Sequence, residues 1–227
     1  MSHTPCGNPS ALPIVVLISG NGSNLQAIID AIRDEQLPIE IRAVISNRPD
    51  AYGLIRARNA GIPTAVIDHK CFDSRTAYEQ VLQQQIDGYA PALVVLAGYM
   101  RILGDAFVDH FEGRMLNVHP SLLPAFPGLN THQRALDAAV IEHGASIHLV
   151  TNELDGGPVI LQAALALRSD DSAETLAQRV HMLEHKIYPL ALRWFAEGRL
   201  TTTGGDVLFD QHPLTRPIKQ GATAAKC

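Results

Sequence analysis

A buried strand, a glycine turn and the start of a helix follow one another in Ile14-Val15-Val16-Leu17-Ile18-Ser19-Gly20-Asn21-Gly22-Ser23-Asn24. The apolar run 14–19 predicts a strand that is covered on both faces. Apolar side chains at helical spacing across 23–34 predict a helix directly after the turn. Glycines let a backbone approach a ligand closely, and a helix N-terminus offers unpaired N–H groups. The segment therefore predicts an anion site, most simply for phosphate, although a tight turn with a helix cap and no ligand explains it equally well.

The same turn differs from the two common nucleotide-binding loops. A dinucleotide loop needs a third glycine where Leu25 stands, and an acid at the end of the next strand, where Ser46 and Asn47 stand instead. A Walker loop is excluded because no Gly-Lys-Ser/Thr sequence is present.

Strands and helices alternate through the first half of the chain. Further strands are predicted at 41–46, 64–67 and 92–97, with helices at 51–60 and 74–87 between them. The run 92–97 is apolar throughout, as expected at the centre of a parallel sheet. This order predicts a single-domain, Rossmann-like α/β fold, with a mostly parallel sheet, helices on both faces and right-handed crossovers.

The second half adds an antiparallel strand pair to this sheet. A strand at 115–119 and a helix at 131–141 precede two strands at 146–151 and 159–167, which are joined through the turn sequence Asp155-Gly156-Gly157. A helix follows at 172–187, and Pro189 marks a break or the start of the next helix, which runs to about residue 197.

One domain is predicted, and no linker divides the chain. We expect it to cover 13–200, with a phosphate-binding half at 13–100 and a second half at 101–200 that carries the chemistry. Residues 1–12 and 201–227 are expected to be irregular tails, with the last ten residues mobile, because they lack periodicity.

Composition narrows the class of protein. The chain has 227 residues, 46% of them hydrophobic, and a net charge of -5, so a general nucleic-acid or membrane binder with a basic face is not expected. The three cysteines are far apart and predict no disulfide framework, which fits a reducing cytoplasm. The longest apolar run, 92–100, is too short to span a bilayer, and the first 13 residues do not resemble a signal peptide.

Asn117, His119 and Asp155 are the candidate catalytic residues. Residues two apart on a strand point to the same face, so Asn117 and His119 project side by side at the end of the strand, where Pro120 stops it. An amide donor beside an imidazole suits a developing oxyanion and a proton in transit, and a nearby carboxylate would favour the charged imidazole. Taken singly, each residue is more simply a turn residue; their expected meeting at one sheet edge indicates attack on a carbonyl-type carbon.

At these residues the chain strongly resembles the phosphoribosylglycinamide formyltransferases, folate-dependent enzymes of purine synthesis. The resemblance covers about residues 13–200. It rests on Val16-Leu17-Ile18-Ser19-Gly20-Asn21-Gly22-Ser23-Asn24-Leu25-Gln26, Leu96-Ala97-Gly98-Tyr99-Met100-Arg101-Ile102-Leu103, Leu116-Asn117-Val118-His119-Pro120-Ser121-Leu122-Leu123-Pro124 and Glu153-Leu154-Asp155-Gly156-Gly157-Pro158-Val159-Ile160.

The resemblance implies transfer of the formyl group of 10-formyltetrahydrofolate, a co-substrate, to the amine of glycinamide ribonucleotide, without a metal. It assigns the catalytic trio to Asn117, His119 and Asp155, and the polar lining of the site to Ser146, His148 and Thr151. The substrate would be bound by Gly22, Ser23, Asn24, Leu25 and Glu184. The folate would be bound by Arg75, Met100, Arg101, Ile102, Leu103 and Asn117. We expect small-molecule partners only, in the cytoplasm, and leave a homodimer open.

One pattern competes with this reading. The segment His181-Met182-Leu183-Glu184-His185 spells H-x-x-E-H, which occurs in some zinc proteases. Such short matches are frequent in a chain with ten histidines, so we expect a substrate-facing Glu184 on an otherwise packed helix instead.

Three other functions remain open at this point. Formyltetrahydrofolate deformylase uses the same trio on water, but that family usually carries an additional amino-terminal domain, and only 13 residues precede the first strand here. Methionyl-tRNA formyltransferase would need a carboxy-terminal RNA-binding module, which about 27 remaining residues do not supply. A nucleotide-binding sensor or dehydrogenase-like module would keep the glycine loop without needing the trio.

Overall fold

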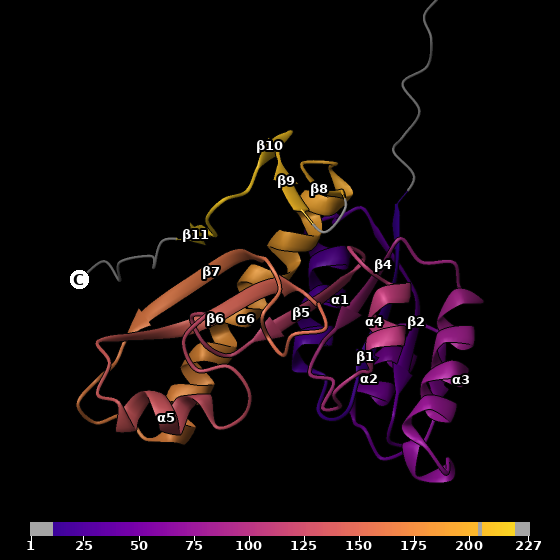
Figure 1. Ribbon diagram of the computed structural model, residues 1–227, viewed down its shortest axis with the longest axis horizontal. Coiled ribbons are helices and arrows are strands. Elements are labelled where there is room, and N and C mark those ends of the chain that lie inside the picture. The colour runs from indigo at the N-terminus through magenta and orange to yellow at the C-terminus, as the bar shows by residue number, and fades with distance from the viewer. Residues whose placement is uncertain (1–10, 204–205, 221–227) are drawn as a thin grey trace, which may run out of the picture.

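An eight-stranded sheet forms the centre of the computed structural model, which describes residues 11–203 and 206–220. The strands lie in the order β11-β7-β6-β5-β4-β1-β2-β3, and every neighbouring pair is parallel except those that β6 makes with β5 and β7 (Figure 1). Their bounds are β1 Leu12–Ile18, β2 Ile39–Ser46, β3 Thr64–Val66, β4 Leu93–Leu96, β5 Met115–His119, β6 Glu142–Leu149, β7 Val159–Ala166 and β11 Ile218–Gln220.

Helices cover both faces of this sheet. The side chains of β1 alternate, so Ile14, Val16 and Ile18 pack toward one hydrophobic core while Val15 and Leu17 pack toward a second core on the other face. Helices α1, α2 and α6 contribute to the first core, and α3 and α4 to the second. The predicted single-domain, mostly parallel α/β fold is confirmed. The helix bounds are α1 Ser23–Asp34, α2 Gly53–Asn59, α3 Arg75–Asp87, α4 Asp105–His110, α5 Thr131–Asp137 and α6 Ala173–Ala196, with a 3-10 turn at His69–Cys71.

The predicted irregular tail at 201–227 is wrong for the part that the structure describes. β8 (Leu200–Thr203), β9 (Asp206–Phe209) and β10 (His212–Pro213) form a separate antiparallel sheet, and β11 joins the main sheet beside β7. These strands have two to four residues, too few to show a period, and tertiary contacts hold them: Phe209 packs edge-on against Trp194 of α6 with ring centroids 4.9 Å apart. The predictions for 1–10 and 221–227 lie outside the described residues.

The predicted break at Pro189 is also wrong, because α6 runs through it as one helix. A proline inside a helix costs about 3 kcal/mol. Here the turns on both sides of Pro189 are anchored in the core by Tyr188 and Leu192, which are fully buried, so packing offsets that cost. None of the described helices is long and apolar enough to cross a membrane.

Two further boundaries differ from the prediction. Helix α5 stops at Asp137, four residues early, because Ala139 takes a left-handed backbone conformation with φ 47° that ends the helix. β6 therefore starts at Glu142 rather than at 146. The antiparallel pairing of β6 with β7 is confirmed, although a loop at 150–158 joins them in place of a tight turn.

Tyr188 fastens α6 to the middle of the sheet. Its buried hydroxyl lies 3.1 Å from the carbonyl oxygen of Leu96, the last residue of β4, and 3.0 Å from that of Leu116, which directly precedes Asn117 in β5. Burial raises the pKa of this hydroxyl well above its ordinary value, so it stays a donor.

We expect Tyr188→Phe to lower the free energy of unfolding by about 1–2 kcal/mol, because two buried carbonyls lose their shared donor. Urea denaturation measures the change. Tyr52→Phe is the matched control, since half of that residue is exposed and its hydroxyl makes no hydrogen bond with the part of the chain that the structure describes. Equal stability of both variants would contradict the anchoring role of Tyr188.

Candidate active site

The predicted phosphate loop is a left-handed turn held against α2. Gly22 has φ 73°, and a Cβ atom there would lie 2.7 Å from the Cα atom of Gly53, so no larger residue fits. Ser23 is the first residue of α1, whose N-terminal N–H groups face outward without helical acceptors. Arg56 binds the loop through Asn21, with Nε 2.9 Å from the backbone oxygen and a second nitrogen 3.0 Å from Oδ1. The loop therefore combines backbone donors with a nearby cation, as an anion site requires.

Asn24 and Glu184, both predicted to contact the substrate, meet in the structure. Asn24 Nδ2 donates to Glu184 Oε2 at 2.7 Å, which links α1 to α6. Burial raises the pKa of Glu184, and the hydrogen bond from Asn24 opposes that rise. The side chain of Leu25 is fully buried in the core. Of the predicted substrate contacts of Leu25, only one through its backbone is therefore possible.

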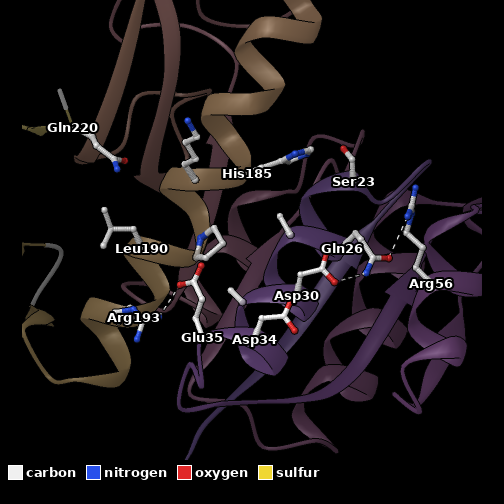
Figure 2. Close-up of a pocket in the computed structure, with 14 residues that line it drawn as sticks. Ser23, Gln26, Asp30, Asp34, Glu35, Arg56, His185, Leu190, Arg193 and Gln220 are labelled. Atoms are coloured by element: carbon white, nitrogen blue, oxygen red, sulfur yellow. Dashed lines mark hydrogen bonds and ion pairs between the residues drawn. The ribbon is translucent and has the colours of Figure 1, made fainter. Parts of the chain in front are cut away.

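A groove of about 630 Å³ runs between α1 and α6 and begins at this loop. Figure 2 shows Ser23 and His185 at one end of the groove and the ion pair of Glu35 with Arg193 at the other. Asp30 lines the wall between them. The groove borders the phosphate loop, and no residue of the catalytic trio lines it.

The three candidate catalytic residues converge at the end of β5. Asn117 and His119 are two residues apart on this strand, so their side chains share one face. Asn117 lies opposite His148 of β6, and His119 lies opposite Ser146. Asp155, in the loop after β6, lies with Oδ2 3.3 Å from His119 Nδ1. The predicted meeting of the three side chains at one sheet edge is thus observed.

Both nitrogens of the His119 ring face hydrogen-bond acceptors. Nε2 lies 2.9 Å from the backbone oxygen of Phe126, and Nδ1 faces the carboxylate of Asp155. These two contacts fix the orientation of the ring at the end of β5.

The Asp155 carboxylate is itself held from a second side. Its Oδ2 atom accepts a hydrogen bond from Gly128 N at 2.8 Å, and its backbone has φ 52°, in the left-handed region. A Cβ atom at Gly157 would collide with the carbonyl oxygen of Leu149, so this glycine lets the loop pass close to β6. The result is a carboxylate fixed beside the imidazole, with its side chain only 9% exposed.

His148 fixes the orientation of the Asn117 amide. Burial lowers the pKa of His148, which keeps its ring neutral. Nδ1 lies 2.8 Å from Leu149 O and donates to it, so Nε2 accepts from Asn117 Nδ2 at 3.1 Å. One N–H of the amide is used in this way, and the second is left to donate elsewhere.

The residues predicted to bind folate form an adjacent surface. The loop after β4 exposes the apolar side chains of Met100 (72%) and Ile102 (66%), while the guanidinium of Arg101 stacks 5.1 Å from the ring centre of Tyr78. Leu103 packs against the second core. β4 pairs with β5, with Leu96 opposite Asn117, so this loop starts beside the trio.

Arg75, also predicted to bind folate, belongs to the same surface. Its Nε atom lies 3.7 Å from Glu79 Oε1, and that oxygen accepts from Gly104 N at 2.9 Å. The first turn of α3 is therefore attached to the loop that carries residues 100–103.

The sequence did not indicate the backbone groups that hold the trio. The Phe126 carbonyl and the Gly128 amide belong to the loop between β5 and α5, and such groups carry no residue-type signal. Ser146 also acts mainly on this loop, because its hydroxyl donates to Ser121 O at 2.7 Å and accepts from Leu123 N at 3.1 Å.

The H-x-x-E-H segment has another arrangement in the structure. Glu184 binds Asn24, while the rings of His181 and His185 stack parallel at 6.3 Å. Among residues 11–203 and 206–220, no group of three or more histidine, cysteine or acidic side chains is positioned to hold a metal.

Comparison with known proteins decides the family. The formyl transferase family model matches residues 12–192. The chain belongs to the formyl transferase family. A phosphoribosylglycinamide formyltransferase of Escherichia coli is 59% identical over 187 residues, which cover 82% of this chain and 88% of that protein. The human trifunctional purine biosynthetic protein adenosine-3 is 44% identical over 185 residues, which are 82% of this chain and 18% of that protein.

Solved structures of the formyl transferase family agree with this result. The phosphoribosylglycinamide formyltransferase of Coxiella burnetii superimposes with a TM-score of 0.87 at 60% identity, covering 91% of this chain and 99% of that one. A glycinamide ribonucleotide transformylase of Symbiobacterium toebii gives 0.86 at 45% identity, covering 91% and 98%. The resemblance inferred from the four sequence motifs is confirmed.

Proposed function

We propose that this chain transfers the formyl group of 10-formyltetrahydrofolate to the amine of glycinamide ribonucleotide, in purine synthesis. Relatives named phosphoribosylglycinamide formyltransferase, which match most of the chain at high sequence identity, support this reaction. The observation that carries it on this chain is the His119–Asp155 pair, 3.3 Å apart, beside Asn117 and on the same sheet edge as a phosphate loop. The site thus offers donors for an oxyanion close to a place for a phosphate monoester.

In the proposed mechanism the substrate amine attacks the formyl carbon directly. The carbonyl oxygen becomes an oxyanion, which accepts hydrogen bonds from the free N–H of Asn117 and from His119. The N–H of His119 that now faces Phe126 O would turn to the oxyanion, since a charged acceptor forms the stronger hydrogen bond. Asp155 sustains the charge on His119. When the intermediate collapses, the bond between the formyl carbon and the folate nitrogen breaks, the imidazolium gives its proton to that nitrogen, and the proton that the attacking amine releases returns to His119.

Binding both substrates together supplies much of the rate. Fixing two reactants in a reactive geometry can contribute roughly 7–11 kcal/mol. We propose that the phosphate loop and Glu184 hold glycinamide ribonucleotide, and that Arg75, Asn117 and residues 100–103 hold the folate. One domain at 13–200 would contain both sites, acting on small molecules in the cytoplasm; the net charge of -5 fits the lack of a nucleic-acid partner.

The reaction is tested by mixing the protein with 10-formyltetrahydrofolate, with and without glycinamide ribonucleotide, and following the release of tetrahydrofolate. Release that needs the ribonucleotide is expected. Equal release without it would mean hydrolysis, as in a deformylase, and would contradict the proposal. If no tetrahydrofolate is released in either mixture, the proposal is also contradicted, and a protein that only binds nucleotides becomes the better explanation.

Replacing Glu184 tests the substrate side of the site. We expect Glu184→Gln to raise the KM for glycinamide ribonucleotide roughly ten-fold, because a hydrogen bond to a charged group is worth about 1.5–3 kcal/mol. The KM for the folate should stay within about two-fold, on the same reasoning that only the lost contact matters. Glu174→Gln, in the exposed first turn of α6, is the matched control. An unchanged KM for the ribonucleotide would remove Glu184 from the binding site.

A further inference from the structure

Ser19 lies directly after β1 and just before the phosphate loop, yet its hydrogen bonds lead to the loop that is proposed to bind folate. Its backbone N–H donates to Gly98 O at 3.1 Å, and its hydroxyl oxygen accepts from Met100 N at 2.8 Å. Both bonds fall on the turn that begins the proposed folate loop, where Gly98 has φ 78°. The side chain and backbone of one residue thus hold both ends of this turn.

The hydroxyl of Ser19 is oriented by Asn47, which directly follows β2. It donates to Asn47 Oδ1 at 2.6 Å, which leaves its lone pairs free to accept from Met100. Asn47 follows β2 and is itself fixed, because its backbone oxygen lies 3.1 Å from His69 Nδ1. Ser19 and Asn47 are both buried, so water does not replace either bond.

We propose that Ser19 is a positioning residue for the folate co-substrate, one that fixes the Met100–Leu103 loop relative to the phosphate loop. This inference rests on the proposed function, because the folate role of that loop does. Met100 and Ile102 are mostly exposed and bury little apolar surface to hold their part of the loop in place, whereas Leu103 at its far end packs against the second core. The bonds of Ser19 at its base therefore set where those side chains stand, while Gly20 and Gly22 follow Ser19 directly into the phosphate loop.

The experiment compares steady-state kinetics of the full chain with Ser19→Ala, Ser19→Thr and the control Ser169→Ala, an exposed serine. We expect Ser19→Ala to raise the KM for 10-formyltetrahydrofolate roughly ten-fold, the effect of about 1.4 kcal/mol from one lost buried hydrogen bond. The KM for glycinamide ribonucleotide should change by less than about two-fold, since only that bond is lost. Threonine keeps the hydroxyl and should restore the folate KM. Equal shifts in both KM values, or no shift, would overturn the inference.

Hydrogen exchange separates this inference from the function on which it rests. In Ser19→Ala the Met100 amide loses its acceptor, so its exchange should accelerate roughly ten-fold while the amides of β1 keep their rates. Unchanged protection of Met100 would overturn the inference whatever the enzyme does. If the native chain releases no tetrahydrofolate, the proposed function fails, and with it the folate role of Ser19. If the Ser19→Thr variant does not fold, Asn47→Ala takes its place, because it removes the acceptor that orients the Ser19 hydroxyl. Asn47→Ala must then raise the folate KM selectively, and an unchanged folate KM would count against the proposal.

Discussion

His119→Ala is expected to lower kcat about 10³-fold while the fold stays intact. The variant loses an oxyanion donor and the proton donor of the proposed mechanism, and each function is worth roughly 10²–10⁴ in rate. The side chain lies at the end of β5 and points to Asp155 and to the Phe126 carbonyl, not into either hydrophobic core. Its removal therefore acts on turnover far more than on folding.

Steady-state rates of tetrahydrofolate release measure this effect. His212→Ala is the matched control, because that histidine is exposed and its ring contacts the backbone oxygen of Asp210, away from the candidate site. Circular dichroism checks that both variants keep the native helix content. A His119→Ala enzyme with a native-like kcat would contradict the assigned role.

Asp155→Asn is the second large effect, with an expected fall in kcat of about 10²-fold or more. Asparagine is isosteric, but it has one acceptor oxygen and no charge. Its single oxygen can still face both the Gly128 amide and the His119 ring, which contact the same Oδ2 atom of Asp155, but without the negative charge it no longer favours the cationic imidazole. The KM values should change little, because Asp155 reaches the substrates only through His119.

An exposed aspartate supplies the control for this variant. Asp170→Asn removes one negative charge from the surface and leaves the site alone, so it separates the local effect from the change in net charge. If Asp155→Asn and Asp170→Asn have the same kcat, Asp155 does not support the reaction.

The central parallel strands were predictable because their side chains are apolar on both faces. Residues 14–19 and 92–97 contain little else than apolar groups, which fits only a central parallel strand covered by helices. The glycine turn and α1 followed from local chemistry: Gly22 takes the left-handed conformation, and the helix spans Ser23–Asp34 as predicted.

The elements that were missed depend on contacts that are remote in sequence. β9 and β11 have four and three residues, and they exist because α6 and β7 offer them a surface. Pro189 was expected to mark a break or the start of a new helix, yet the helix continues through it while Tyr188 binds the carbonyl oxygens of Leu96 in β4 and Leu116 in β5. Local propensity carries no information on such contacts.

The same division applies to the candidate site. Asn117, His119 and Asp155 were found because their side chains have a recognisable chemistry at a strand end and in a glycine turn. The groups that hold them were not found, since the Phe126 carbonyl and the Gly128 amide are backbone atoms available to any residue. Ser19 was missed for a different reason: a serine at a strand end has many uses, and only its partners distinguish them.

A crystal structure of the chain with glycinamide ribonucleotide and a folate analogue that cannot release its formyl group tests the central claim most directly. We expect the ribonucleotide amine about 3–3.5 Å from the formyl carbon, with its phosphate on the N-terminus of α1. We also expect side-chain nitrogens of Asn117 and His119 about 3 Å from the formyl oxygen. A formyl group bound well beyond hydrogen-bonding distance of both residues would contradict it.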